Sequence, residues 1–179
     1  EIKPNLSTTH YNLGNLYREK RDLNLAIQSY KKAIEITPNF AEAQNNLGIC
    51  FQEIGDFKNS IASFNLALKI NPKYFEVYKN LGDVFQSMGN KELGLQNYEK
   101  AIENKIVNAD IYLNLGKLYQ EKNNNEKAIK NFRNAIKSRK NCFEAYSNLG
   151  LCLHRKGEIN SAIDNYIIAL KINPESSEV

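Results

Sequence analysis

The sequence of 179 residues predicts an all-α solenoid built from five tandem helical hairpins. The first observation is a fixed period, because the pair Leu-Gly recurs every 34 residues without insertion. The second is that each 34-residue repeat carries two sets of apolar residues at helical spacing, and the third is a turn-forming pair between the two sets. A fixed period of this length indicates stacked supersecondary units. The five pairs are Leu13-Gly14, Leu47-Gly48, Leu81-Gly82, Leu115-Gly116 and Leu149-Gly150.

The period also sets the expected boundaries of the repeats. With the glycine of each pair as the eighth position, the repeats are residues 7–40, 41–74, 75–108, 109–142 and 143–176. Residues 1–6 are then the end of a truncated preceding repeat, and residues 177–179 are a short tail. Consecutive repeats follow one another directly, so each hairpin is expected to stack on the next.

The first helix of each repeat is predicted from apolar residues at positions 7, 10 and 11, such as Leu47, Cys50 and Phe51. This spacing places them on one face of a helix. A pair such as Gly55-Asp56 then stops the helix and lets the chain reverse. The fourth repeat has Asn123 in place of the turn glycine.

The second helix is predicted from apolar residues at positions 21, 24, 27 and 28, and it ends near a proline, which cannot continue a helix. The prolines are Pro38, Pro72 and Pro174, and Pro4 has the same place in the preceding repeat. Ile106 and Lys140 replace the proline in repeats three and four, so the helix ends are expected to differ there.

A small residue facing a large one explains how the two helices meet. Glycine at position 8 lets the backbones approach, and an aromatic residue at position 24 fills the space beside it. The aromatic residues are Tyr30, Phe64, Tyr98, Phe132 and Tyr166. Because one hairpin cannot bury its apolar faces alone, stability is shared between neighbouring hairpins.

The pattern of Leu13, Gly14, Tyr17, Ala26, Tyr30, Ala33 and Pro38, repeated at 34 residues, resembles the tetratricopeptide repeat. The resemblance covers essentially the whole chain. It implies a right-handed superhelix whose concave groove is lined by the first helices, with positions 2, 5, 6, 9, 12 and 13 facing that groove.

Composition and charge exclude several classes of protein. The 24 Lys and Arg residues against 20 Asp and Glu give a net charge of +4, which does not indicate a nucleic-acid binder. No apolar run approaches the length of a membrane-spanning helix. Cys50, Cys142 and Cys152 lack C-x-x-C spacing, so we interpret them as buried apolar groups in a reducing compartment, the cytoplasm or nucleus.

Catalytic and metal-binding chemistry is not expected within these residues. His10 occupies a position where three other repeats carry a tyrosine, and His154 has no second ligand nearby in the sequence. The glycines serve helix contacts and turns, so no phosphate-binding loop is predicted. The chain is therefore expected to need no cofactor, and its function should come from its surfaces.

Position 6 carries the clearest functional signal, because asparagine occupies it in every repeat: Asn12, Asn46, Asn80, Asn114 and Asn148. An amide side chain can pair with both the C=O and the N–H of a peptide backbone, whatever the peptide's sequence. The row resembles the asparagine ladder of the tetratricopeptide domain in protein O-linked N-acetylglucosamine transferases. Duplication of one ancestral asparagine, or an asparagine-rich genome, would also produce it.

Other groove positions supply apolar and charged groups. Tyr11, Ile49, Leu113 and Leu151 have no obvious core role, so they are candidates either for pockets that accept ligand side chains or for partial burial between hairpins. Lys79 and Lys117 add positive charge beside them. The groove lacks the consecutive Lys and Arg residues with which family members hold the carboxylate tails of chaperones.

The last repeat is unusual, because Ile167 and Ile168 stand where the other repeats are mostly polar. Apolar residues at such a surface need a cover. Association with another copy, continuation into a longer array and ordinary packing within the last hairpin would each supply one.

The sequence therefore predicts a protein–protein interaction module that binds an extended peptide segment of a partner in its groove, with no nucleic-acid or membrane partner. A first alternative is the substrate-recognition region of a larger glycosyltransferase whose catalytic domain lies outside this chain. A second alternative is a scaffold that self-associates through its C-terminal repeat.

Overall fold

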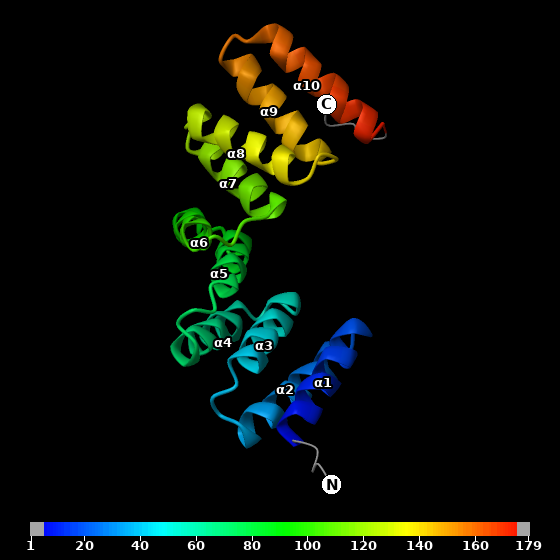
Figure 1. The fold of residues 1–179 in the computed structure, drawn as a ribbon, viewed down its shortest axis with the longest axis vertical. Coiled ribbons are helices and arrows are strands. Elements are labelled where there is room, and N and C mark those ends of the chain that lie inside the picture. The colour runs from blue at the N-terminus through cyan, green and yellow to red at the C-terminus, as the bar shows by residue number, and fades with distance from the viewer. Residues whose placement is uncertain (1–5, 175–179) are drawn as a thin grey trace. The chain divides into compact units, whose positions relative to one another are not determined.

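The chain divides into two compact units, residues 1–104 and residues 105–179. The computed structural model describes residues 6–174, and within that range it contains ten helices and no strand (Figure 1). The truncated preceding repeat predicted at residues 1–6 lies outside the described residues, apart from Leu6, which begins the first helix. The predicted tail at residues 177–179 also lies outside them.

The N-terminal unit consists of three helical hairpins. Hairpin 1 is α1 (Leu6–Glu19) with α2 (Leu23–Ile36), hairpin 2 is α3 (Ala41–Glu53) with α4 (Phe57–Ile70), and hairpin 3 is α5 (Glu76–Ser87) with α6 (Lys91–Glu103). Each second helix packs on the first helix of the next hairpin, α2 on α3 and α4 on α5.

The C-terminal unit consists of two hairpins with the same connections. Hairpin 4 is α7 (Ala109–Glu121) with α8 (Asn125–Ser138), and hairpin 5 is α9 (Phe143–Arg155) with α10 (Ile159–Ile172). Helix α8 packs on α9. The predicted all-α fold of five tandem hairpins is confirmed, whereas the residues at which each repeat begins and ends remain a prediction.

The turns inside the hairpins depend on two consecutive residues. The first adopts a positive φ, between 57° and 85°, in all five hairpins. The second caps α2, α4, α6 and α8 by accepting a hydrogen bond from the backbone N–H three residues later, and these capping residues are Asp22, Asp56, Asn90 and Asn124. Asn123 takes the glycine's place with a φ of 57°, because asparagine tolerates this conformation.

The missing prolines have different consequences in hairpins 3 and 4. Helix α6 ends at Glu103, one repeat position earlier than the other second helices, and Lys105 follows with a φ of 64°. Helix α8 ends at Ser138, at the usual position. The expected change in helix ends is therefore found in hairpin 3 and not in hairpin 4.

The predicted packing of small against large residues is confirmed. A Cβ atom built on Gly14 would lie 2.6 Å from Cε1 of Tyr30, and one on Gly116 would lie 2.4 Å from Cε1 of Phe132. These distances are shorter than ordinary Cβ contacts, so any side chain at these positions would force the aromatic ring to shift. Each aromatic ring of hairpins 1 to 4 is fully buried in this way, whereas Tyr166 of hairpin 5 is partly exposed.

Cys50, Cys142 and Cys152 are unpaired and buried, as expected, and burial raises the pKa of Cys50 to about 11. None of the helices between residues 6 and 174 combines the length and the apolar character needed to span a membrane.

Candidate functional site

The N-terminal unit carries a groove of about 780 Å³ on its first helices. Most of its lining comes from the C-terminal halves of α1, α3 and α5, which the hairpin stacking brings side by side. The lining residues are Arg18, Glu19, Arg21, Ile49, Gln52, Glu53, Phe57, Lys79, Asn80, Asp83 and Ser87. Three residues predicted for the binding site, Ile49, Lys79 and Asn80, therefore meet in one groove.

The apolar part of this groove is formed by Ile49 and Phe57. Both pack against a buried cluster that includes Phe64, Val77 and Leu81, and both keep part of their surface exposed. The groove thus has a fixed apolar floor, because the side chains that form it are held from below by the core.

The charges around the floor are nearly balanced. Lys79 pairs with Asp83 one turn further along α5, at 2.5 Å. Asp83 also accepts a hydrogen bond of 2.7 Å from the hydroxyl of the buried Tyr98. Arg18 and Arg21 lie in the same groove as Glu19 and Glu53. The groove therefore offers separate positive and negative groups and not a surface of one sign.

A network of side-chain hydrogen bonds joins the asparagines near this groove. Nδ2 of Asn46 on α3 donates to Oδ1 of Asn15 at 3.0 Å and to the hydroxyl of Tyr11 at 3.2 Å, both on α1. The hydroxyl of Tyr30 donates to the same oxygen of Asn15 at 2.7 Å, and burial raises the pKa of Tyr30 to about 12. Both N–H groups of Asn46 thus donate hydrogen bonds within the protein.

The network continues from α3 to α5. Nδ2 of Asn45 donates to Oδ1 of Asn46 at 3.2 Å, and Nδ2 of Asn80 donates to Oδ1 of Asn45 at 2.9 Å. Side-chain amides thereby connect the first helices of three consecutive hairpins. Two asparagines of the predicted row, Asn46 and Asn80, have a structural role in addition to any contact with a ligand.

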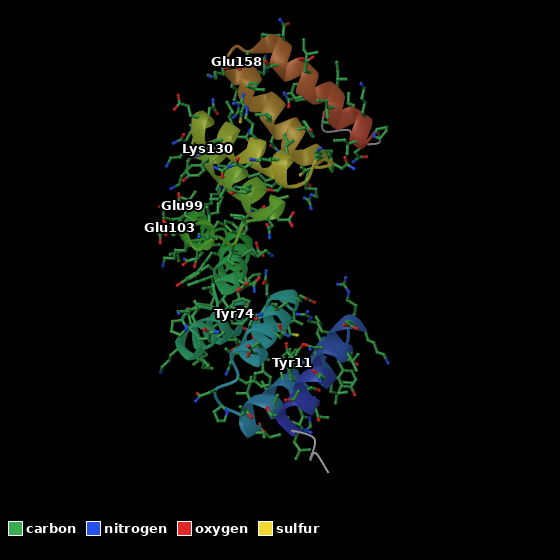
Figure 2. The ribbon with its side chains drawn as sticks, in the orientation of Figure 1. Tyr11, Tyr74, Glu99, Glu103, Lys130 and Glu158 are labelled. Carbon is green, nitrogen blue, oxygen red and sulfur yellow. The ribbon has the colours of Figure 1, made fainter. Side chains whose placement is uncertain are left out.

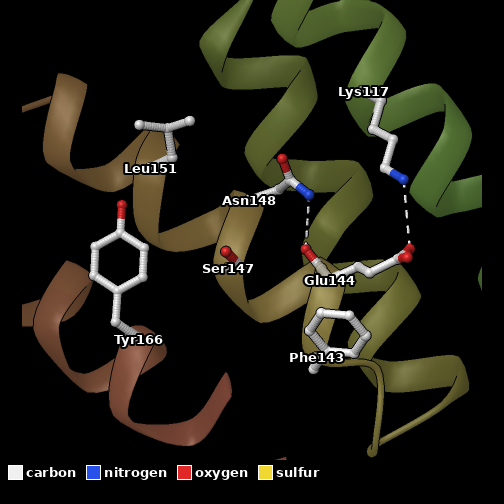
Figure 3. Close-up of a pocket in the computed structure, with 7 residues that line it drawn as sticks. All are labelled: Lys117, Phe143, Glu144, Ser147, Asn148, Leu151 and Tyr166. Atoms are coloured by element: carbon white, nitrogen blue, oxygen red, sulfur yellow. Dashed lines mark hydrogen bonds and ion pairs between the residues drawn. The ribbon is translucent and has the colours of Figure 1, made fainter. Parts of the chain in front are cut away.

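The C-terminal unit carries a smaller pocket of about 370 Å³ (Figure 3). It is lined by Lys117 of α7, by Phe143, Glu144, Ser147, Asn148 and Leu151 of α9, and by Tyr166 of α10. Three more of the predicted site residues, Lys117, Asn148 and Leu151, meet here.

The single cation of this pocket has an acidic partner. Nζ of Lys117 lies 3.4 Å from the carboxylate of Glu144, and Nδ2 of Asn148 donates to the backbone carbonyl of Glu144 at 2.8 Å (Figure 3). The hydrogen bond fixes the orientation of the Asn148 amide, whose oxygen is left for other partners. Burial raises the pKa of the Tyr166 hydroxyl, so the phenol remains protonated at neutral pH.

Tyr11 and Leu113 do not line either cavity. Tyr11, which is labelled in Figure 2, belongs to α1. Its ring packs against the rings of Tyr30 and Phe40, with centroids 5.9 Å and 4.9 Å away. Leu113 is only 4% exposed, and Ile111 and Leu115 on the same helix are buried with it. Leu113 therefore lies in the core and lines neither of these two cavities.

The two remaining asparagines of the row have different surroundings. Asn12 is exposed on α1, while Asn114 on α7 is partly buried. Asparagine is thus present at this position in every repeat, but the surroundings of the five side chains differ. They cannot all contact a ligand in the same way.

Sequence reasoning missed four lining residues that matter, Phe57, Asp83, Phe143 and Tyr166. Asp83 could have been predicted, because it stands at position 9, one of the groove positions. Phe57 and Phe143 begin their helices, and Tyr166 was assigned only to packing within the hairpin. Their place in a cavity depends on how far neighbouring helices cover them, which the repeat pattern does not state.

Helix α10 exposes an apolar face. Ile159, Ile163, Ile167 and Leu170 follow one another at helical spacing and are 41% to 49% exposed, and Ile168 is 37% exposed. Of the equivalents of Ile163 in the other hairpins, Ile27, Leu95 and Ile129 are at most 8% exposed and Ile61 is partly buried. Among residues 6–174, no cluster of His, Cys, Asp and Glu side chains could hold a metal ion.

Four family models match the chain, and all four describe the tetratricopeptide repeat. One matches residues 14–55, and the others match residues 41–74, 75–105 and 113–177. No curated protein sequence matches the chain.

Solved structures with the same fold cover nearly the whole chain. A crystal structure of MamA is 26% identical, with a TM-score of 0.81 over 97% of this chain and 94% of that one. YrrB, described as a TPR protein with an unusual peptide-binding site, is 20% identical, with a TM-score of 0.77 over 94% and 87%. The pilF protein of Pseudomonas aeruginosa is 19% identical, with a TM-score of 0.84 over 96% and 78%. At these identities, the likeness to YrrB and pilF is one of fold alone.

Proposed function

The chain consists of tetratricopeptide repeats, and on this premise we propose that it is a protein-interaction module that binds an extended segment of a partner protein on its first helices. YrrB, which has the same fold, is described as having a peptide-binding site, and this supports the proposal. The glycosyltransferase alternative has no support among the matched families and structures reported above.

The main structural support for this function is the groove of the N-terminal unit. Its apolar floor of Ile49 and Phe57 would accept an apolar side chain, while Arg18, Glu53 and Lys79 around it would pair with charged or polar groups. Neighbouring first helices lie on the order of 10 Å apart, and an extended chain advances about 3.3 Å per residue. Three first helices therefore accommodate roughly six residues of an extended peptide.

The asparagine row would act through fewer members than the sequence predicted. Asn80 and Asn148 both line a cavity, and in each the amide nitrogen is held by an intramolecular hydrogen bond. Each would present its oxygen to an N–H of the bound backbone. Asn46 has no N–H left for a ligand, so we assign it to the connection between α1 and α3.

Selection of peptides on the immobilised chain tests this function. A random library of twelve-residue peptides should yield binders, and their dissociation constants are measured by fluorescence anisotropy. The variant Ser87→Arg places a long side chain at an exposed edge of the groove, and it should weaken binding about tenfold or more. Gln28→Arg adds the same charge on the exposed face of α2, outside the groove, and should leave binding unchanged.

Two results would contradict the proposal. A selection that enriches no peptide above the bare surface would show that the chain does not bind peptides in this manner. Equal losses of affinity in Ser87→Arg and Gln28→Arg would show that the groove is not the binding surface and that the added charge alone is responsible.

The exposed face of α10 favours self-association as a second candidate. Its four aliphatic residues would be covered if another copy packed there. Sedimentation equilibrium of the wild type should then show a mass that rises with concentration, and Ile163→Glu with Ile167→Glu should abolish the rise. A concentration-independent monomer mass for the wild type would exclude this candidate.

A further inference from the structure

The residues at positions 9 and 24 of the repeats are chemically matched in hairpins 1 and 3. The hydroxyl of Tyr30 donates to Asn15 at 2.7 Å, and the hydroxyl of Tyr98 donates to Asp83 at 2.7 Å. In both cases a tyrosine at position 24 has an acceptor at position 9 of the same hairpin. Hairpins 2 and 4 have Phe64 and Phe132 at position 24, which carry no hydroxyl and need no acceptor.

Hairpin 5 has a tyrosine at position 24 but no acceptor at position 9. Tyr166 stands at position 24, but position 9 is Leu151, whose side chain cannot accept a hydrogen bond. Within residues 6–174 the Tyr166 hydroxyl has no hydrogen-bond partner, and Figure 3 shows it directed toward Leu151 at the edge of the pocket. The hairpin therefore places a protonated hydroxyl in a cavity without using it internally.

The other groups of the pocket indicate which ligand this hydroxyl would meet. The positive charge of Lys117 faces the carboxylate of Glu144, so the pocket has no unbalanced cation for an anionic ligand. The oxygen of Asn148 remains available as an acceptor, because the contact with Glu144 uses only its nitrogen. Leu151 and Phe143 add apolar surface beside these two groups. A donor, an acceptor and an apolar wall match an uncharged peptide unit next to an apolar side chain.

We propose that the C-terminal pocket binds one peptide unit of the partner segment, with the Tyr166 hydroxyl donating to its C=O and the Asn148 oxygen accepting from an adjacent N–H. This inference rests on the proposed function and names the group recognised at a second place on the chain. Leu151 determines the specificity of the pocket, because its inability to accept leaves the hydroxyl for the ligand. The bound residue would be apolar and would lie against Leu151 and Phe143.

The smallest probe with these features is N-acetyl-leucine methylamide, which has two peptide units, an apolar side chain and no charge. Its binding to the whole chain is measured by NMR titration with ¹³C-labelled tyrosine, and the Tyr166 resonance is assigned from the Tyr166→Phe variant. We expect the probe to shift the Tyr166 resonance. In Tyr166→Phe, binding followed on the backbone amides of α9 should be about two- to tenfold weaker.

Two further variants test the role of Leu151. Leu151→Asn supplies the acceptor that Asn15 provides in hairpin 1, so it should hold the Tyr166 hydroxyl internally and weaken the probe more than Leu151→Ala does. Once Tyr166→Phe is also present, the two substitutions should have equal effects, because no hydroxyl remains. Tyr30→Phe is the matched control, since its hydroxyl is already bonded to Asn15, and it should leave probe binding unchanged.

The outcomes separate this inference from the proposed function. If Tyr166→Phe binds the probe as the wild type does, or if the probe leaves Tyr166 unshifted, the pocket is not a peptide-unit site, while library peptides that bind the N-terminal groove would still support the proposed function. If N-acetyl-leucine binds tenfold more tightly than its methylamide, the pocket recognises a carboxylate and the inference is wrong. A third outcome is that the probe shifts the Tyr166 resonance but no peptide is enriched from the library. This outcome would support the peptide-unit site in the C-terminal pocket and contradict peptide binding in the N-terminal groove.

Discussion

The amide nitrogen of Asn80 lies 2.9 Å from the side-chain oxygen of Asn45, and this hydrogen bond joins α5 to α3. Asn45 is 6% exposed and in turn donates to Asn46, which bonds to Asn15 and Tyr11 on α1. In a repeat protein, stability depends on the interfaces between neighbouring units. A polar connection that crosses two such interfaces should therefore contribute to the coupling of the hairpins.

Replacement of Asn45 by alanine should destabilise the N-terminal unit by about 1–3 kcal/mol, because the partly buried amide groups of Asn46 and Asn80 would each lose a partner. Urea unfolding followed by circular dichroism measures this loss. Asn12→Ala is a control from the first helix of hairpin 1, where the asparagine side chain is exposed, and it should change the stability by less than about 0.5 kcal/mol. Equal effects of the two substitutions would show that the network is not stabilising.

The contact between Gly116 and Phe132 predicts an unusual response to alanine. In an ordinary helix, glycine to alanine stabilises by about 1 kcal/mol. Here the added Cβ atom would lie 2.4 Å from the Phe132 ring, so Gly116→Ala should destabilise hairpin 4 by about 1–3 kcal/mol. Thermal unfolding measures the change. With Phe132→Leu in the same chain the penalty of the alanine should fall, and strictly additive effects would contradict the proposed clash.

Stability should decline at high pH because two buried acids must remain neutral in the folded chain. Burial raises the pKa of Cys50 from 9.0 to about 11 and that of Tyr30 from 10.0 to about 12. The unfolded chain therefore loses these protons first, so the stabilisation is complete below pH 9 and is lost as the pH rises toward 11 and 12. The loss is about 1.4 kcal/mol per pH unit for each group.

Cys50→Ala separates the contribution of the thiol from that of the tyrosine. The free energy of unfolding, measured in urea between pH 8 and 11, should fall less steeply for this variant than for the wild type. The exposed carboxylates and amines are common to both chains, so the difference reports Cys50. Parallel pH profiles would mean that the thiol ionises in the folded chain as easily as in the unfolded one.

Much of the fold could be predicted because it depends on contacts at fixed sequence distances. Gly14 and Tyr30, sixteen residues apart, meet within one hairpin, and the same pair recurs in every repeat. The turn at Arg21 was not predicted, because the signal used was glycine, yet Arg21 adopts a φ of 64° beside the capping residue Asp22.

The candidate site was less predictable, because it depends on contacts between hairpins. The sequence places Asn46 in a row of five, but its partners Asn15 and Tyr11 lie 31 and 35 residues away and are reached only when α1 packs beside α3. Leu113 and Leu151 are both leucines at predicted groove positions of their repeats. The first is 4% exposed and the second lines a pocket, because exposure depends on what each neighbouring helix covers.

Removing one hydroxyl at a time should distinguish tyrosines that serve the fold from the one that does not. Tyr98 donates to the Asp83 carboxylate at 2.7 Å and contacts the Gln86 amide oxygen at 2.9 Å, so Tyr98→Phe should cost about 1.5–3 kcal/mol. Tyr166→Phe removes a hydroxyl without an internal partner in the described part of the chain, so its cost should lie within about 0.5 kcal/mol of zero. Both values come from urea unfolding at neutral pH. A large loss in Tyr166→Phe would mean that the hydroxyl is bonded within the folded chain, and it would then be unavailable to a peptide.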